Sequence, residues 1–257
     1  MLGRSRLRCA ARVLVFAVCS LSGGWSMAAA GEVRVAVATN FRVPLEELRP
    51  DFEKQTGHHL KLSAGSTGKL YAQIRLGSPF HVFMAADQER PQKLVDEGLA
   101  VPGSTITYAR GQLTLWAKDW DGPLSADSLV HPKVSWLAIA SPELAPYGRA
   151  AMDLLHALGV LENLTGKLAM GENVGQAFAF VQTQNAQLGL VALSQVLQYE
   201  DGLRGQRWDP PSDLYGPILQ DAVLLDRARE NPAAIAFMAF LASPETRSRV
   251  ASMGYLP

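Results

Sequence analysis

The sequence predicts an α/β protein of two lobes joined by a hinge. Segments typical of buried strands alternate with segments of helical spacing along most of the chain. This alternation is the pattern of mostly parallel sheets flanked by helices. Four times a strand ends in small or polar residues and a helix begins, at "ATNF", "AGSTGK", "PYGRAA" and "ENVGQA". The first two junctions and the last two are expected to belong to different lobes.

The first lobe is expected to begin with residues 31–110. Its predicted strands and helices alternate along the chain. The strands are 32–40, 58–65 and 81–87, and the helices are 43–57, 67–77 and 88–99. The first helix has apolar residues at Leu45, Leu48 and Phe52 and stops at Gly57, which suits a C-terminal cap.

The second lobe is expected over residues 111–205, and residues 206–257 are expected to return to the first lobe. The predicted elements follow in chain order. They are strands at 111–118, 134–141, 166–172, 188–196 and 214–225, and helices within 142–159, 173–184 and 232–254. The last helical segment is interrupted near Ser243 and Pro244. A late strand and terminal helices that pack on the first lobe would make that lobe discontinuous.

Residues 1–30 have the pattern of an export signal. A basic region precedes the apolar run "VLVFAVCSLSGGW", and the small residues of "SMAAAG" suit cleavage near Ala30. The run is too short and too rich in Ser and Gly to favour a membrane anchor. Both cysteines, Cys9 and Cys19, lie in this segment, so the mature chain has no thiol for disulfides or catalysis. A lipoprotein signal needs a residue smaller than Val18 directly before the cysteine, so lipidation of Cys19 is not expected.

Composition limits the class of protein further. Hydrophobic residues make up 48% of the chain and charged residues 19%, as in a well-packed soluble protein. Removal of residues 1–30, which carry four arginines and no acids, leaves a net charge of about −4. No basic run with interleaved aromatic residues is present, so a nucleic-acid partner is not expected.

The strand-to-helix junctions carry the candidate binding chemistry. A helix N-terminus offers unpaired N–H groups and a partial positive charge, which together suit an anion. Thr39, Asn40, Ser66 and Thr67 add hydroxyl and amide donors at such positions. Each one alone is more simply a helix cap. Four junctions without a nearby carboxylate, Glu172 being the exception, favour an anion site between the lobes.

Other chemistries fit the sequence less well. In "GSTGK" the glycines Gly65 and Gly68 are too close for a nucleotide phosphate loop. No GxSxG elbow, HExxH motif or Cys/His cluster is present, so neither a catalytic serine nor a metal cation is indicated. A secreted hydrolase that pairs Ser66 with a histidine remains a hypothesis of a different class. The sequence gives no reason to expect an enzyme.

Six segments together resemble the periplasmic molybdate-binding proteins of ABC transporters. They are "VAVATNFRVPLEELRPDFEKQTG", "LSAGSTGKLYAQI", "FHVFMAADQERPQKLVDEGL", "PELAPYGRAAMDLLHALG", "ENVGQAFAFVQTQNAQLGLVALSQ" and "FMAFLASPETRSRVASMGY". The resemblance implies a two-lobed periplasmic-binding-protein fold that closes on molybdate or tungstate. It also implies a monomer in the periplasm that delivers this oxyanion to a membrane ABC permease and needs no cofactor. Sulfate or phosphate as the ligand, and a sensor as the downstream partner, stay open.

The resemblance also assigns site residues. In the first lobe the donors would be Thr39 and Asn40, with Thr67 or its neighbour Ser66. In the second lobe they would be Tyr147 and the backbone N–H of Val174. Some relatives have a tyrosine where Ala192 and Leu193 stand here, and a small residue in place of Tyr147. We therefore expect Tyr147 to supply the phenol in this chain, although its position after a proline also fits an aromatic residue on the rim.

Overall fold

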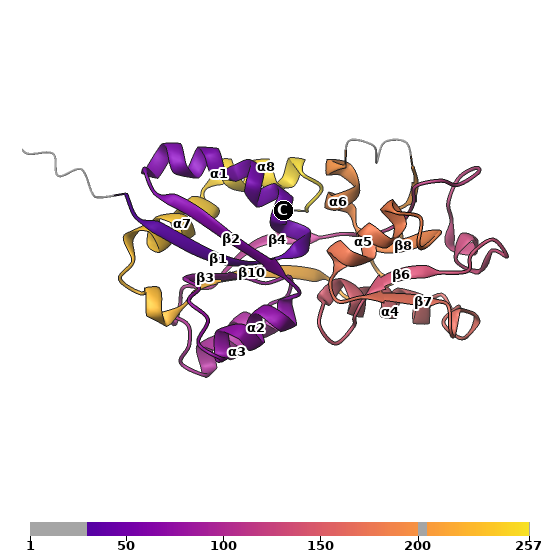
Figure 1. The fold of residues 1–257 in the computed structure, drawn as a ribbon, viewed down its shortest axis with the longest axis horizontal. Helices are drawn as coiled ribbons and strands as arrows, with labels where there is room; N and C mark the ends of the chain where they lie inside the picture. Colours follow the sequence, from indigo (N-terminus) through magenta and orange to yellow (C-terminus); the bar gives the residue numbers. More distant parts are fainter. Residues whose placement is uncertain (1–29, 200–204, 257) are drawn as a thin grey trace, which may run out of the picture.

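The computed structural model describes residues 30–199 and 205–256. It contains two α/β lobes that lie side by side, with strands that pass between them (Figure 1). The expected export signal lies outside the described residues. Within the described part of the chain, no helix is both long enough and apolar enough to cross a bilayer.

The first lobe is built on a five-stranded mixed sheet. Its strand order is β2-β1-β3-β10-β4. The strands are β1 (Glu32–Ala38), β2 (His59–Gly65), β3 (Val82–Met84), β4 (Ile106–Gly111) and β10 (Ile218–Leu224). β1 pairs in parallel with β2 and β3, whereas β10 is antiparallel to β3 and β4.

Helices cover both faces of this sheet (Figure 1). One face carries α1 (Arg42–Thr56), α7 (Pro232–Ala242) and α8 (Pro244–Ser252), and the other carries α2 (Thr67–Arg75) and α3 (Glu89–Asp96). Leu45, Leu48 and Phe52 of α1 are buried, as their spacing predicts. Gly57 ends α1 at a φ of 69°, a conformation that glycine adopts without strain. The break predicted near Ser243 is present. α7 ends just before Ser243, whose side chain caps α8 by accepting the Thr246 N–H.

The second lobe contains another five-stranded mixed sheet, in the order β7-β6-β8-β5-β9. Its strands are β5 (Leu113–Ala117), β6 (Leu137–Ala140), β7 (Leu168–Gly171), β8 (Leu188–Ala192) and β9 (Gln206–Trp208). Its helices are α4 (Pro146–Ala157), α5 (Val174–Gln182) and α6 (Leu193–Gln198). Short 3-10 helices complete the described elements: η1 (Thr39–Phe41), η2 (Ala126–Val130), η3 (Glu162–Leu164) and η5 (Asp226–Ala228).

The expected two-lobed α/β fold is confirmed, with differences in detail. Both sheets are mixed, because β5 and β10, the strands that enter each lobe from the other, run antiparallel to their neighbours. β9 pairs with β5, so the chain returns to the first sheet after Trp208, not at residue 206. Strand β4 lies where the sequence pattern predicted no strand before residue 111. The predicted strand 188–196 stops at Ala192 and continues as helix α6.

Candidate functional site

In each lobe, two neighbouring parallel strands end at the same edge of their sheet and lead into helices. In the first lobe Ala38 is in register with Gly65, so Thr39 and Ser66 leave adjacent strands together. In the second lobe Ala140 is in register with Gly171, and the chain continues to α4 and α5. Ligands of open α/β sheets bind beyond these carboxyl ends.

The junctions of the two lobes touch each other. The Gly68 N–H at the start of α2 donates to the Leu144 carbonyl, at 2.9 Å, just before α4. The Gly175 N–H in the first turn of α5 donates to Thr39 Oγ1 at 3.4 Å. The structure is therefore a closed form, in which each first-lobe junction contacts a junction of the second lobe.

Ser66 is a buried hydroxyl that no other group uses. Its side chain is 2% exposed, and its Oγ has no hydrogen-bond partner among the described residues. Ser66 stands at the N-cap of α2 but makes no side-chain capping bond. Buried polar groups are almost always paired, so an unpaired hydroxyl at this position indicates a missing partner.

Thr67, the predicted alternative to Ser66, has a structural contact. Its Oγ1 accepts the Ala86 N–H at 3.1 Å, which ties the start of α2 to the segment after β3. Of the two neighbours, Ser66 is the one whose hydroxyl makes no bond at all among the described residues, whereas Thr67 accepts one bond and keeps its own proton.

Thr39 and Asn40 lie at the site but differ in orientation. The Thr39 hydroxyl accepts the Gly175 N–H and keeps its own proton available. The Asn40 amide nitrogen turns inward, toward Gln220 Oε1 at 2.8 Å and the Tyr255 hydroxyl at 3.1 Å. Asn40 is 1% exposed, so its side chain belongs to a buried network beside the site.

Tyr147 points into the protein and is not a rim residue. It lies in the first turn of α4 and is 1% exposed. Its hydroxyl is 3.3 Å from Gln220 Nε2. Burial raises the pKa of the Tyr147 phenol well above its usual value, so the group is a neutral donor at physiological pH.

Val174 begins α5, where the backbone presents free donors. Asn173 caps the helix by accepting the Gln176 N–H, and the Gly175 N–H is directed to Thr39. Within the described residues, the Val174 N–H has no such partner. It is therefore available to a ligand, together with the partial positive charge of the helix end.

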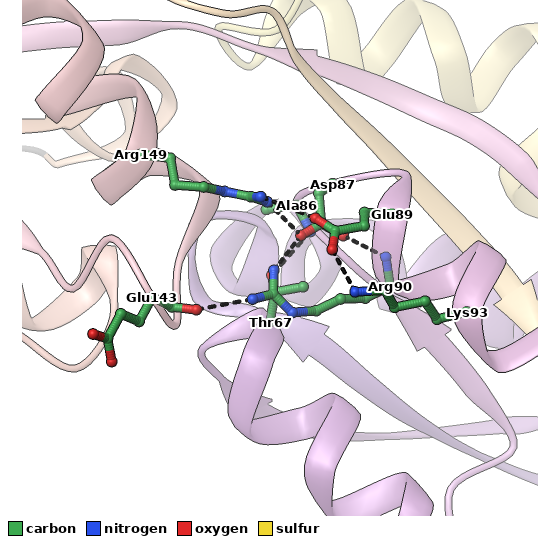
Figure 2. Close-up of polar contacts among 8 residues, drawn as sticks. All are labelled: Thr67, Ala86, Asp87, Glu89, Arg90, Lys93, Glu143 and Arg149. Carbon is green, nitrogen blue, oxygen red and sulfur yellow. Dashed lines mark hydrogen bonds and ion pairs between the residues drawn. The ribbon is translucent and has the colours of Figure 1, made fainter.

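Charged residues near the site pair with each other across the lobes (Figure 2). Arg149 of α4 contacts Asp87 at 3.1 Å and Glu89 at 2.9 Å. Arg90 of α3 also pairs with Asp87, and its Nη2 donates to the Glu143 carbonyl at 2.9 Å. Hydrogen bonds from Lys93 and then Arg149 lower the pKa of Glu89 to about 2. The cationic side chains near the site are therefore paired with acidic side chains, in contacts that connect the two lobes.

Glu172, the one carboxylate near a junction, is also paired across the lobes. Its two carboxylate oxygens lie 3.1 Å and 3.2 Å from Lys69 Nζ. Its charge is thus neutralised by the first lobe. In the ranges that the structure describes, no group of three or more histidine, cysteine or acidic side chains could hold a metal cation.

Sequence reasoning missed three residues of this site. Gln220 and Tyr255 form hydrogen bonds with Asn40, and a side chain on Gly111 would collide with the Tyr147 hydroxyl. A weak signal existed for Gln220, since it and Asp221 are the polar residues of a mostly apolar strand. Neither Gly111 nor Tyr255 follows a strand-to-helix junction, the pattern on which the prediction depended.

Comparison with known proteins places this geometry in a family. The model of the bacterial extracellular solute-binding protein family matches residues 33–256. The molybdate-binding protein ModA of Rhodobacter capsulatus is 45% identical over 89% of this chain and 90% of its own length. ModA of Azotobacter vinelandii is 45% identical over 89% of this chain and 91% of its own length.

A solved structure agrees with these sequence matches. The periplasmic molybdate-binding protein of Azotobacter vinelandii superimposes with a TM-score of 0.83 and 38% identity, over 88% of this chain and 99% of that one. The chain described here belongs to the family of bacterial extracellular solute-binding proteins.

Proposed function

We propose that this chain captures molybdate or tungstate between its lobes. The observation that carries the proposal is the buried Ser66 hydroxyl, which makes no capping bond and has no hydrogen-bond partner in the part of the chain that the structure describes. It lies at the same sheet edge as Thr39, in a form where the lobes touch. Relatives at 45% identity are named molybdate-binding proteins.

The proposed binding shell consists of neutral donors from both lobes. Thr39, Ser66 and the backbone N–H of Asn40 would come from the first lobe. Tyr147 and the Val174 N–H would come from the second. Hydrogen bonds to a charged group contribute about 1.5–3 kcal/mol each. Several such bonds, with the partial charges of the helix N-termini, would replace the water that the dianion loses.

Selectivity among tetrahedral oxyanions would then depend on size. The donors do not distinguish sulfate from molybdate by chemistry, because both present four oxygen acceptors. A closed shell that fits the larger anion holds a smaller one with longer and weaker bonds. This proposal makes sulfate and phosphate poor ligands.

The wider role that we propose follows the family. The mature chain would act in the periplasm as a monomer and would deliver the oxyanion to a membrane ABC permease. The oxyanion is the cargo, so the scheme contains no catalytic step, no cofactor and no nucleic acid. Lobe closure would signal occupancy, because the cross-lobe contacts exist only when the lobes meet.

Isothermal titration of the mature chain with molybdate, tungstate, sulfate and phosphate tests the ligand. We expect tight binding of the first two and much weaker binding of the others. Tight binding of sulfate or phosphate alone would overturn the ligand assignment. Absence of binding to all four would contradict the function.

A matched pair of serine variants tests the site. Ser66→Ala should weaken molybdate binding by about tenfold or more, because one bond to the dianion is lost. Ser63→Ala is the control, since Ser63 is exposed on β2, three residues before Ser66. Equal affinities of the two variants would exclude Ser66 from the shell.

A further inference from the structure

Gln220 is a fully buried amide that connects the two lobes beside the proposed anion site. It lies in β10 of the first lobe and is 0% exposed. Its Oε1 accepts a hydrogen bond from Asn40 at 2.8 Å, and its Nε2 donates to the Tyr147 hydroxyl of the second lobe at 3.3 Å. One side chain thus contacts a residue from each half of the site.

The neighbours of Gln220 fix which way its amide points. Gln220 Oε1 lies 2.8 Å from the Asn40 amide nitrogen, which can only donate. The Tyr108 hydroxyl lies 3.0 Å from the same oxygen, but its single proton also faces the Ala85 carbonyl at 2.9 Å, so Tyr108 does not fix the orientation. The Asn40 amide is in turn oriented by Tyr255, whose hydroxyl donates to the Asn40 carbonyl at 2.8 Å and so accepts from the Asn40 amide nitrogen at 3.1 Å. The carbonyl end of Gln220 therefore faces Asn40, and its amino end faces Tyr147.

This orientation determines what the Tyr147 hydroxyl can do. A phenol has one proton to donate and can also accept. Gln220 Nε2 is an amide nitrogen that can donate but not accept, so the Tyr147 hydroxyl must accept from it. Among the described residues, no acceptor uses the Tyr147 proton, which stays free for a ligand.

The backbone at Gly111 leaves room for the contact between Gln220 and Tyr147. A Cβ added to Gly111 would lie 2.2 Å from the Tyr147 hydroxyl and 2.6 Å from Gln220 Nε2. Only a glycine leaves room for the two groups to meet at this point of the strand that leads between the lobes. The pairing of β10 with β4 is also irregular between Gln220 and Asp221, and such bulges redirect side chains.

We propose that Gln220 is a positioning residue for oxyanion binding, which fills the acceptor site of the Tyr147 hydroxyl and thereby directs its proton at the ligand. The inference rests on the proposed function. It adds a residue that acts through Tyr147 and does not itself touch the anion. It also connects the two lobes through one amide, since Asn40 and Tyr147 are held from opposite ends of Gln220.

A double-mutant cycle read by molybdate titration tests this role. The proteins are the unchanged chain, Gln220→Met, Tyr147→Phe and the double variant. Methionine keeps the length of glutamine but cannot donate. Gln220→Met should weaken binding about tenfold in the presence of Tyr147, and by less than about twofold when Tyr147 is already phenylalanine. Such coupling is not expected if Gln220 only fills space.

Two further proteins complete the experiment. Tyr108→Phe removes the other hydroxyl that contacts Gln220 and should change the affinity by no more than about twofold. If thermal unfolding shows that Gln220→Met does not fold, Gln220→Leu replaces it in the cycle. Leucine also removes the donor toward Tyr147 and adds no charge beside the anion, so the same dependence on Tyr147 is expected.

The outcomes separate the two proposals. Tight binding by the unchanged chain, with equal losses from Gln220→Met in both backgrounds, would overturn the role of Gln220 alone. Absence of molybdate binding by the unchanged chain would overturn the proposed function, and the inference with it.

Discussion

At the scale of single residues, the site depends on hydroxyl groups held in a dry environment. Ser66 and Tyr147 are each at most 2% exposed, so their hydroxyl groups have lost the hydrogen bonds to water that they make in the unfolded chain. An unpaired buried polar group costs about 1–3 kcal/mol, and this cost is removed when a ligand arrives. Part of the proposed binding energy would therefore come from pairing the Ser66 hydroxyl with the ligand.

The Tyr147 hydroxyl gives the most direct residue-level prediction. Tyr147→Phe should weaken molybdate binding by about tenfold to a hundredfold, because a bond to a dianion is worth more than a neutral one. Isothermal titration measures the change. Tyr71→Phe is the control, since the Tyr71 hydroxyl bonds to Glu97 on the surface. A Tyr147→Phe protein that binds as tightly as the control would contradict the assignment.

The pH dependence of binding follows from the same residue. Burial raises the pKa of Tyr147 above its usual value of about 10, so its donor proton is retained in mildly alkaline solution. Affinity should therefore stay constant from about pH 7 to about pH 9. The raised pKa favours the folded state below pH 10, and this contribution is lost as the pH rises further. A loss of affinity already between pH 7 and pH 9 would mean that another group supplies the proton.

The candidate donors that the sequence predicted share one physical property. Thr39, Asn40, Ser66, Thr67 and Val174 all follow a strand and open a helix, so local periodicity locates them. Their orientations could not be predicted, because they depend on partners far along the chain. Asn40 contacts Gln220, 180 residues away, and Tyr255, 215 residues away.

At the scale of elements, the strands that pass between the lobes limit the site. β4 ends at Gly111, where the chain crosses to β5, and this point lies against Tyr147. The tight contact explains why the crossing needs a residue without a side chain. Sequence periodicity did not reveal β4, because no strand was predicted before residue 111, so the role of Gly111 could not be inferred from it.

The close approach at Gly111 gives an element-level prediction. Gly111→Ala should weaken molybdate binding by about tenfold or more, because the Tyr147 hydroxyl must move away from the new Cβ. Gly216→Ala is the control, since the nearest atom to its added Cβ is 3.5 Å away. Titration and thermal unfolding of both variants separate loss of binding from loss of fold. Unchanged affinity of Gly111→Ala would show that the Tyr147 position is not critical.

Other elements were missed for reasons of length and context. β9 has only three residues, of which two are exposed, so no alternation could mark it. Helix α6 follows directly on β8, and its buried Leu193 and Val196 read as a continuation of the strand. Longer elements with clear periodicity, such as α1, were predicted within a residue of their ends.

At the scale of the whole molecule, charged residues hold the lobes together at the side of the site. Arg149 bridges to Asp87 and Glu89 of the other lobe, and Lys69 bridges to Glu172 (Figure 2 shows the Arg149 cluster). None of these contacts was predictable from the sequence, because the partners lie 60 or more residues apart. They favour closure without placing a cation among the proposed donors.

Removal of one bridge should therefore shift the balance between open and closed forms. Arg149→Ala should weaken molybdate binding about twofold to fivefold, as exposed ion pairs contribute about 0.2–1 kcal/mol each. Arg207→Ala is the control, because Arg207 pairs with Asp209 inside the second lobe. X-ray scattering of the ligand-free proteins should show a larger mean radius for Arg149→Ala alone. Equal radii and affinities for the two variants would contradict a role in closure.

The account as a whole claims that an oxyanion lies among neutral donors from both lobes. Crystals of the mature chain grown with molybdate test this directly, by anomalous diffraction at the molybdenum absorption edge. We expect one strong peak between the lobes, with the oxyanion within hydrogen-bonding reach of Ser66 Oγ, the Tyr147 hydroxyl and the Val174 N–H. A peak beside Arg90 and Arg149 instead, or none between the lobes, would contradict the account.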